Sequence, residues 1–159
     1  MPSKTETSLP SQPLQALSVG AIVTITQESA QAYVAPINST QFAIAMGNPP
    51  PKFLKSTFVI TMYQFNGSNQ AKISLQPLGM EGLYWVAGQS VEGLTNPILL
   101  APEPGHFLLT DVGDGHITIR NTRVPPGPYL HGYGKGVRVL SYGFDKPLIQ
   151  GRFSIQLVG

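Results

Sequence analysis

The sequence contains no cysteine. This absence excludes a disulfide framework and a catalytic thiol, and it favours a reducing compartment. The chain also lacks a long apolar run: its first 18 residues, MPSKTETSLPSQPLQALS, are polar and have no apolar core of the kind found in a signal peptide or a membrane span. We therefore expect a cytoplasmic protein without a membrane span, with a flexible polar leader at residues 1–18.

Charged residues are scarce as well, at 11% of the chain. The net charge of +2 is too small to indicate a polyanionic partner, so a nucleic acid is not expected. The three histidines, His106, His116 and His131, have no metal-ligand spacing, and no nucleophile motif is present. The sequence thus predicts neither an enzyme nor a bound metal or cofactor.

Glycine and proline, by contrast, are plentiful, with 17 and 15 residues, and hydrophobic residues make up 42% of the chain. This balance is typical of short strands joined by many turns and not of amphipathic helices. A chain of 159 residues suits one domain with a core of its own. The composition predicts an all-β protein.

Four landmarks recur three times, in the same order, along the chain. Each unit starts with a strand, in VTIT, KISL and ITIR, that carries one inward aliphatic residue: Ile25, Leu75 and Ile119. An aromatic residue follows at a nearly constant distance: Tyr33, Tyr84 and Tyr129. After a third apolar strand (FAIAM, PILL, VRVL), each unit closes with a strand that brings a phenylalanine: Phe58, Phe107 and Phe153. We expect these aliphatic and phenylalanine residues to form the core.

Three units of four short strands bury their apolar faces only by closing on one another. We therefore predict a β-trefoil, in which three pseudo-repeats build a six-stranded barrel capped by three hairpins. The single domain is expected at residues 19–159, with repeats at about 19–64, 65–112 and 113–159. The third repeat begins at GDG, where Asp114 and Gly115 can supply the positive φ that a tight hairpin demands.

The single tryptophan, Trp85, directly follows the landmark Tyr84. If Tyr84 points into the core, strand alternation turns Trp85 outward, where its ring offers a flat apolar face to a sugar and an N–H donor at its edge. The alternative is that Trp85 packs beneath the loop 87–101. The sequence leaves both orientations open.

With its units aligned, the chain resembles small cytosolic β-trefoil proteins of mushrooms, a group that includes fruiting-body defence lectins, such as those of Coprinopsis, and protease inhibitors. The resemblance covers roughly residues 57–159 and rests on LYWVAGQ, NPILLAPEPGHFLLT and GRFSIQLV. It implies a lectin that binds the chitobiose core of N-glycans without a cofactor. The implied site comprises Trp85, which stacks on a sugar ring, and the stretch containing Glu103, Gly105 and His106, which hydrogen-bonds its hydroxyls.

A second reading assigns the function to loops. NTRVPPGP presents Arg123 and Val124 on a backbone stiffened by proline, and PPPKFLK presents Lys52 in a comparable setting. Either basic residue suits the acidic specificity pocket of a trypsin-like protease, and stiffening reduces the entropy lost on docking. We favour binding of glycans or glycoproteins. The alternatives are inhibition of a serine protease through Arg123 or Lys52 and binding of another protein through the loops.

Overall fold

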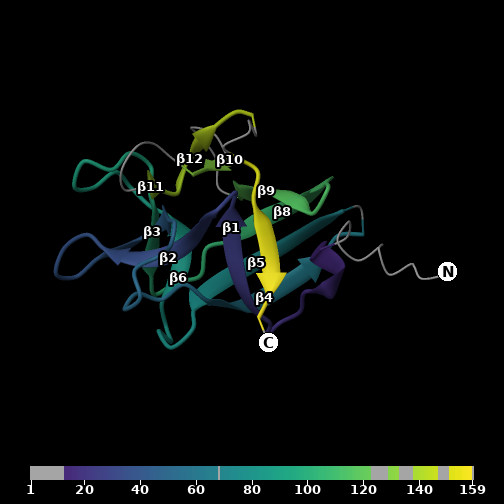
Figure 1. The fold of residues 1–159 in the computed structure, drawn as a ribbon, viewed down its shortest axis with the longest axis horizontal. Coiled ribbons are helices and arrows are strands. Elements are labelled where there is room, and N and C mark those ends of the chain that lie inside the picture. Colours follow the sequence, from purple (N-terminus) through teal and green to yellow (C-terminus); the bar gives the residue numbers. More distant parts are fainter. Residues whose placement is uncertain (1–12, 68, 123–128, 133–137, 147–150, 159) are drawn as a thin grey trace.

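The computed structural model describes residues 13–67, 69–122, 129–132, 138–146 and 151–158. Within these ranges the chain forms thirteen strands and one short 3-10 helix, η2, but no α-helix (Figure 1). The all-β prediction is confirmed. The elements are η2 (Pro13–Ala16), β1 (Ile22–Gln27), β2 (Ala30–Pro36), β3 (Phe42–Gly47), β4 (Phe58–Phe65), β5 (Gln70–Pro77), β6 (Tyr84–Ala87), β7 (Ile98–Ala101), β8 (Phe107–Gly113), β9 (His116–Asn121), β10 (Tyr129–His131), β11 (Arg138–Val139), β12 (Ser141–Phe144) and β13 (Ser154–Leu157).

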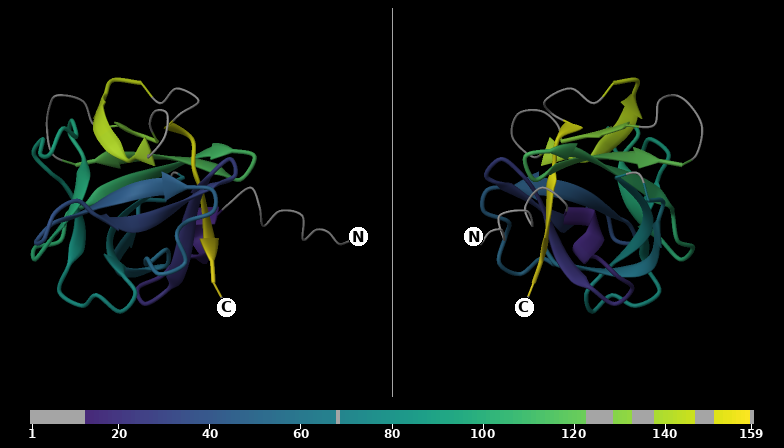
Figure 2. Two further views of the ribbon diagram at one scale, coloured as in Figure 1. Left: turned by 60° about the vertical axis from the view of Figure 1, so that its left-hand side comes forward. Right: turned by 90° about the vertical axis from the view of Figure 1, so that its right-hand side faces the viewer.

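The described strands belong to one antiparallel sheet. Eleven of them are hydrogen-bonded in the order β12-β10-β9-β8-β5-β4-β1-β2-β3-β7-β6, while β11 pairs with β3 and β13 with β1. Figure 1 shows β13, in yellow, beside β1, and both views of Figure 2 show the strands wrapped around a common interior. Because Phe153, just before β13, also bridges to Ile117 of β9, the sheet curls into a nearly closed, barrel-like form.

The prediction of a β-trefoil is wrong. That fold would combine a six-stranded barrel with three hairpin caps, whereas here one hydrogen-bonded path of eleven strands runs through all three predicted units. The units also differ from one another: β2 pairs with β3 and β6 with β7, but β10 pairs with β12, and the two-residue β11 joins β3 of the first unit. Alternation of residues identifies strands and their buried faces, but it does not say which edges pair.

The core positions predicted from the landmarks are confirmed. All six are at most 1% exposed and pack in one cluster: Ile25, Phe58, Leu75, Phe107, Ile119 and Phe153. Fully burying a side chain of this size contributes about 1.5–3 kcal/mol to the free energy of unfolding. The alternation along the strands therefore identified the residues that hold the sheet closed.

The turn between β8 and β9 is also confirmed. Gly113 lies opposite His116, so that Asp114 and Gly115 form a two-residue loop with φ of 58° and 78°. Positive φ at both loop residues is what a type I′ turn requires, and this turn matches the twist of the flanking strands. The side chain of Asp111 accepts a hydrogen bond of 2.9 Å from the backbone N–H of Gly113, which explains this carboxylate structurally.

The packed part of the chain begins earlier than predicted. Leu14 and Leu17 are buried in the main core cluster, and the Tyr63 hydroxyl donates a 2.7 Å hydrogen bond to the carbonyl oxygen of Leu14. Within the segment predicted as a leader, two leucines at a spacing of three both turn toward the core. Residues 1–12 lie outside the described residues.

His131 is a buried polar side chain that the strand pattern did not identify as core. Its ring stacks on Phe144, with centroids 3.8 Å apart, and its Nε2 lies 3.1 Å from the carbonyl oxygen of Lys146. Burial lowers the pKa of His131, and the hydrogen bond to the Lys146 carbonyl offsets part of this effect. The His131 side chain thus contributes to the packing of β10 against β12.

In the described part of the chain no helix is long and apolar enough to cross a membrane.

Candidate functional site

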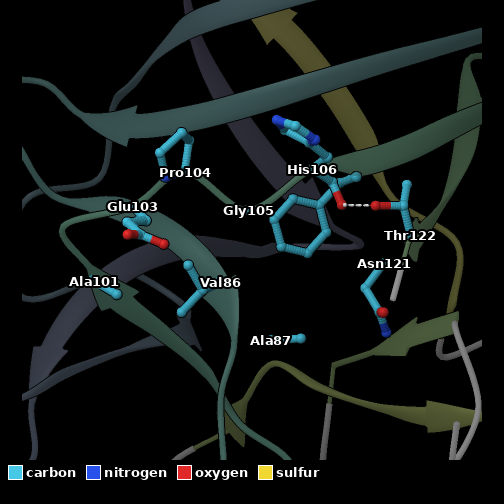
Figure 3. A pocket seen from close by; sticks show the side chains of 10 residues that line it. Val86, Ala87, Ala101, Glu103, Pro104, Gly105, His106, Asn121 and Thr122 are labelled. Atoms are coloured by element: carbon cyan, nitrogen blue, oxygen red, sulfur yellow. Dashed lines mark hydrogen bonds between the residues drawn. The ribbon is translucent and has the colours of Figure 1, made fainter. Parts of the chain in front are cut away.

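A cavity of about 330 Å³ opens between the β6–β7 hairpin and the end of the β8–β9 hairpin. In Figure 3, Glu103 and Ala101 lie on one side of this cavity, Asn121 and Thr122 on the other, and the segment 104–106 runs across the top. Its lining residues are Val86, Ala87, Ala101, Glu103, Pro104, Gly105, His106, Phe107, Asn121 and Thr122.

The segment that follows β7 is held against the backbone of β6. The N–H of Gly105 donates a 3.1 Å hydrogen bond to the carbonyl oxygen of Trp85. An added Cβ at Gly105 would lie only 2.5 Å from that oxygen and 3.0 Å from the Cα of Val86. Glycine is therefore required here by the close approach of two backbones.

A second pair of hydrogen bonds fixes the other side of the cavity. The carbonyl oxygen of His106 accepts hydrogen bonds of 3.2 Å from both the N–H and the hydroxyl of Thr122 (Figure 3). These bonds extend the pairing of β8 with β9 by one residue beyond Phe107 and Asn121, which lie opposite each other. The cavity walls are consequently held by backbone contacts on both sides.

The structure brings together three of the four predicted sugar-binding residues. Glu103, Gly105 and His106 all line the cavity, with His106 exposed at its rim. Thr122, Val86 and Ala87 also line it and are not among the residues predicted from the sequence. Thr122 follows β9 directly, in the stretch NTRVPPGP that was predicted to form the inhibitory loop, and only the register of β8 against β9 reveals its place beside His106.

Of the two orientations that the sequence leaves open for Trp85, the structure shows the buried one, so Trp85 does not present its ring to a sugar as the resemblance implies. Its side chain is 0% exposed, whereas Tyr84 is only half-buried. The indole packs at nearly right angles against Phe58 and Phe107, with ring centroids 5.0 and 6.2 Å away. Two phenylalanines of the core thus surround Trp85, and its ring has no free face for a sugar. Trp85 borders the site only through its carbonyl oxygen, which accepts the hydrogen bond from Gly105.

Both polar and apolar residues line the cavity. The carboxylate of Glu103, the hydroxyl of Thr122 and the imidazole of His106 supply hydrogen-bond acceptors and donors. Apolar surface comes from residues such as Val86 and Ala87. A neutral ligand with several hydroxyls and exposed C–H groups is complementary to such a wall. The described residues contain no group of three or more His, Asp or Glu side chains that could hold a metal ion.

Lys52, the second candidate for the inhibitory loop, lies at the tip of a turn between β3 and β4. The N–H of Leu54 donates a 3.1 Å hydrogen bond to the carbonyl oxygen of Pro51, so that Lys52 and Phe53 are the central turn residues. Lys52 is exposed, and Phe53 is 97% exposed. The N–H of Val34 holds the end of the loop through a 2.8 Å hydrogen bond to the carbonyl of Lys55.

The first candidate for the inhibitory loop, Arg123 with Val124, lies outside the described residues.

Comparison with known proteins adds no family to these observations: no family profile matches the chain, and no curated protein is detectably similar to it. The cavity and the exposed residues are therefore the basis for a functional proposal.

Proposed function

We propose that the protein is a carbohydrate-binding protein and that the cavity beside Glu103 receives one sugar residue of a glycan. The observation that carries this proposal is that Glu103, His106 and Thr122, from two separate segments, line one small cavity together with apolar residues of β6. A volume of about 330 Å³ is at the lower end for a small-molecule site, which suits a single ring better than a long ligand.

The chemistry of the walls supports a sugar over a wholly apolar ligand. A carboxylate accepts hydrogen bonds from two neighbouring hydroxyls, and such charge-assisted bonds are about twice as strong as neutral ones. Because Trp85 is buried, the apolar contribution comes from smaller side chains such as Val86 and Ala87. We accordingly infer a weak single site, for which several copies or several sites are needed to give useful avidity.

The choice of ligand follows the sequence resemblance to cytosolic mushroom lectins at residues 103–106 alone, because this chain has neither the β-trefoil fold nor the exposed tryptophan that the resemblance implies. The Gly105 segment coincides with the stretch along which that resemblance implies glycan contacts. The glycan proposed on this basis is chitobiose or an N-glycan core, and the proposed role is defence in a fungus. Trp85 has no part in the revised site.

Glu103→Gln is expected to weaken binding of chitobiose about ten-fold or more, because it removes the charge from hydrogen bonds worth about 1.5–3 kcal/mol. Isothermal titration calorimetry measures this change. The matched control is Glu81→Gln, an exposed carboxylate outside the cavity, which should bind as the wild type does. Equal affinities for all three proteins, or no binding of chitobiose or an N-glycan core by the wild type, would rule out the site.

A second candidate function, inhibition of a serine protease, is favoured by the exposed Lys52–Phe53 turn. The turn projects a basic residue next to an aromatic one, and Pro51 restricts the backbone before it. A protease cleft that receives an extended segment requires this closed turn to open first, which costs affinity. The turn therefore supports inhibition less well than the cavity supports sugar binding.

If Lys52 enters a trypsin-like specificity pocket, an excess of protein should inhibit trypsin, and Lys52→Ala should reduce the inhibition at least ten-fold because the cationic anchor is lost. Hydrolysis of a chromogenic arginine substrate measures the effect. Lys55→Ala is the matched control, since it removes a neighbouring exposed lysine outside the turn tip. Full trypsin activity in excess wild-type protein would eliminate Lys52 as an inhibitory residue.

A further inference from the structure

Four side chains form one row across the outer face of the sheet. Lys72 of β5 lies opposite Leu108 of β8, Leu108 lies opposite Arg120 of β9, and Arg120 lies opposite Tyr129 of β10. Residues that lie directly opposite each other in antiparallel strands project from the same face. We call these four residues the cross-strand row.

The burial of neighbouring positions shows that this face is the outer one. None of the four row residues is buried. The next residues along the same strands, among them Ile73, Phe107 and Ile119, are at most 1% exposed. The row therefore lies on the solvent side of a sheet whose other side is the core.

Among the residues that the structure describes, two cations of the row have no counter-charge. In the part of the chain that the structure describes, neither Lys72 nor Arg120 forms an ion pair with a carboxylate. The guanidinium carbon of Arg120 lies 5.7 Å from the centroid of the Tyr129 ring, in a cation–π contact. This contact orients Arg120 without neutralising it. Its guanidinium keeps its donors for an anion, which it can bind with two parallel hydrogen bonds.

The row begins close to the rim of the cavity, although none of its four residues lines the cavity itself. Thr122 lies two residues after Arg120, and His106 two residues before Leu108. The hydrogen bonds between Thr122 and His106 keep these residues paired in the register of β8 with β9. Two residues of a strand span about 7 Å, so that one glycan chain can reach from the cavity rim to Arg120. Lys72 lies two strands further along the row, about 10 Å from Arg120 at the backbone.

We propose that the glycan of this site is acidic, with a sulfate or carboxylate on the sugar residue next to the cavity bound by Arg120, and a further acidic group bound by Lys72. This inference rests on the proposed carbohydrate function. Glu103 places the acidic group outside the cavity, because a carboxylate there disfavours a second negative charge. Leu108, between the two cations, supplies apolar surface for the ring that joins the acidic groups.

A single-stranded nucleic acid fits the row less well. Such ligands are bound by successive aromatic platforms along a positively charged groove. The row has one aromatic ring, Tyr129, and Arg120 already lies over it. The whole chain carries a net charge of only +2. Two cations beside a hydroxyl-binding cavity are more complementary to a short acidic oligosaccharide.

Calorimetric titration with three probes tests the inference: chitotetraose, a heparin-derived tetrasaccharide and an eight-residue oligothymidylate. We expect the wild type to bind the heparin tetrasaccharide at least ten-fold more tightly than chitotetraose, with a difference that shrinks as salt is added. Arg120→Gln should remove most of this preference and leave the affinity for chitotetraose unchanged. The variant is expected to fold normally because its side chain lies on the outer face.

Arg152→Gln is the matched control, since it removes an exposed arginine outside the row and should bind both sugars like the wild type. A preference that also survives in Arg120→Gln, or equal binding of both sugars by the wild type, would overturn the acidic-glycan inference and leave the carbohydrate function standing. Failure of all three probes to bind would count against the carbohydrate function itself. Tighter binding of the oligothymidylate, lost in Arg120→Gln, would replace the inference by a nucleic-acid site.

Discussion

Replacement of Trp85 by alanine is expected to lower the free energy of unfolding by about 3–5 kcal/mol, the range for deleting a large buried aromatic side chain. The indole is 0% exposed and is packed between Phe58 and Phe107. Its removal leaves a cavity at the centre of the core, and both ring contacts are lost. Urea unfolding followed by far-ultraviolet circular dichroism measures the change without relying on the deleted fluorophore.

Trp85→Phe is the informative comparison. A phenyl ring preserves part of the packing against Phe58 and Phe107. It also removes the indole Nε1, a buried donor that has no hydrogen-bond partner in the described part of the chain. Burial of an unpartnered donor costs about 1–3 kcal/mol. Its removal therefore offsets part of the stability that is lost because the phenyl ring fills less of the core. We expect a clearly smaller loss of stability than in the alanine variant. An alanine variant as stable as the wild type would show that Trp85 does not lie in the core.

The sequence predicted the core well because the core depends on local alternation. Ile25, Leu75 and Ile119 were recognisable since each stands between polar neighbours in a short strand. The hairpin at Asp114 and Gly115 depends on two adjacent residues, and it too was predictable. Both features are decided by interactions over a few positions of the chain.

Pairing between distant strands could not be predicted in this way. The β-trefoil prediction assumed that three similar units pair identically, but β11 joins β3 and β10 joins β12. Strand β11 has only two residues, so its alternation carries little information about its partner. Which edges pair depends on the closure of the whole sheet.

Alternation alone could not decide the orientation of Trp85. It shows that Tyr84 and Trp85 face opposite ways, but not which of them faces the core. In the structure the larger apolar ring, that of Trp85, lies in the core and packs against Phe58 and Phe107. Similarly, Glu103, Gly105 and His106 were predictable as one stretch, whereas Thr122 joins them only through strand register.

Gly105→Ala is expected to impair both stability and sugar binding. The new Cβ would lie 2.5 Å from the carbonyl oxygen of Trp85, and this backbone atom belongs to β6, which is paired with β7 and cannot readily move. The segment 103–106 must shift instead, which weakens the hydrogen bond from the Gly105 N–H. Overpacking of this kind costs about 1–3 kcal/mol. Urea unfolding and titration with chitobiose measure the two effects.

Gly82→Ala is the control for this prediction, because it introduces backbone strain without the crowding expected at Gly105. Gly82 has a φ of +86°, but an added Cβ would meet no atom within 4 Å, and the residue does not line the cavity. We expect Gly82→Ala to lose about 1–2 kcal/mol, the cost of a left-handed conformation, while binding chitobiose normally. A Gly105→Ala protein that folds stably and binds chitobiose like the wild type would contradict the close packing of this segment against β6. If it folds stably but does not bind, the position of Glu103 and His106 is what the glycine controls, since these residues move with the displaced segment.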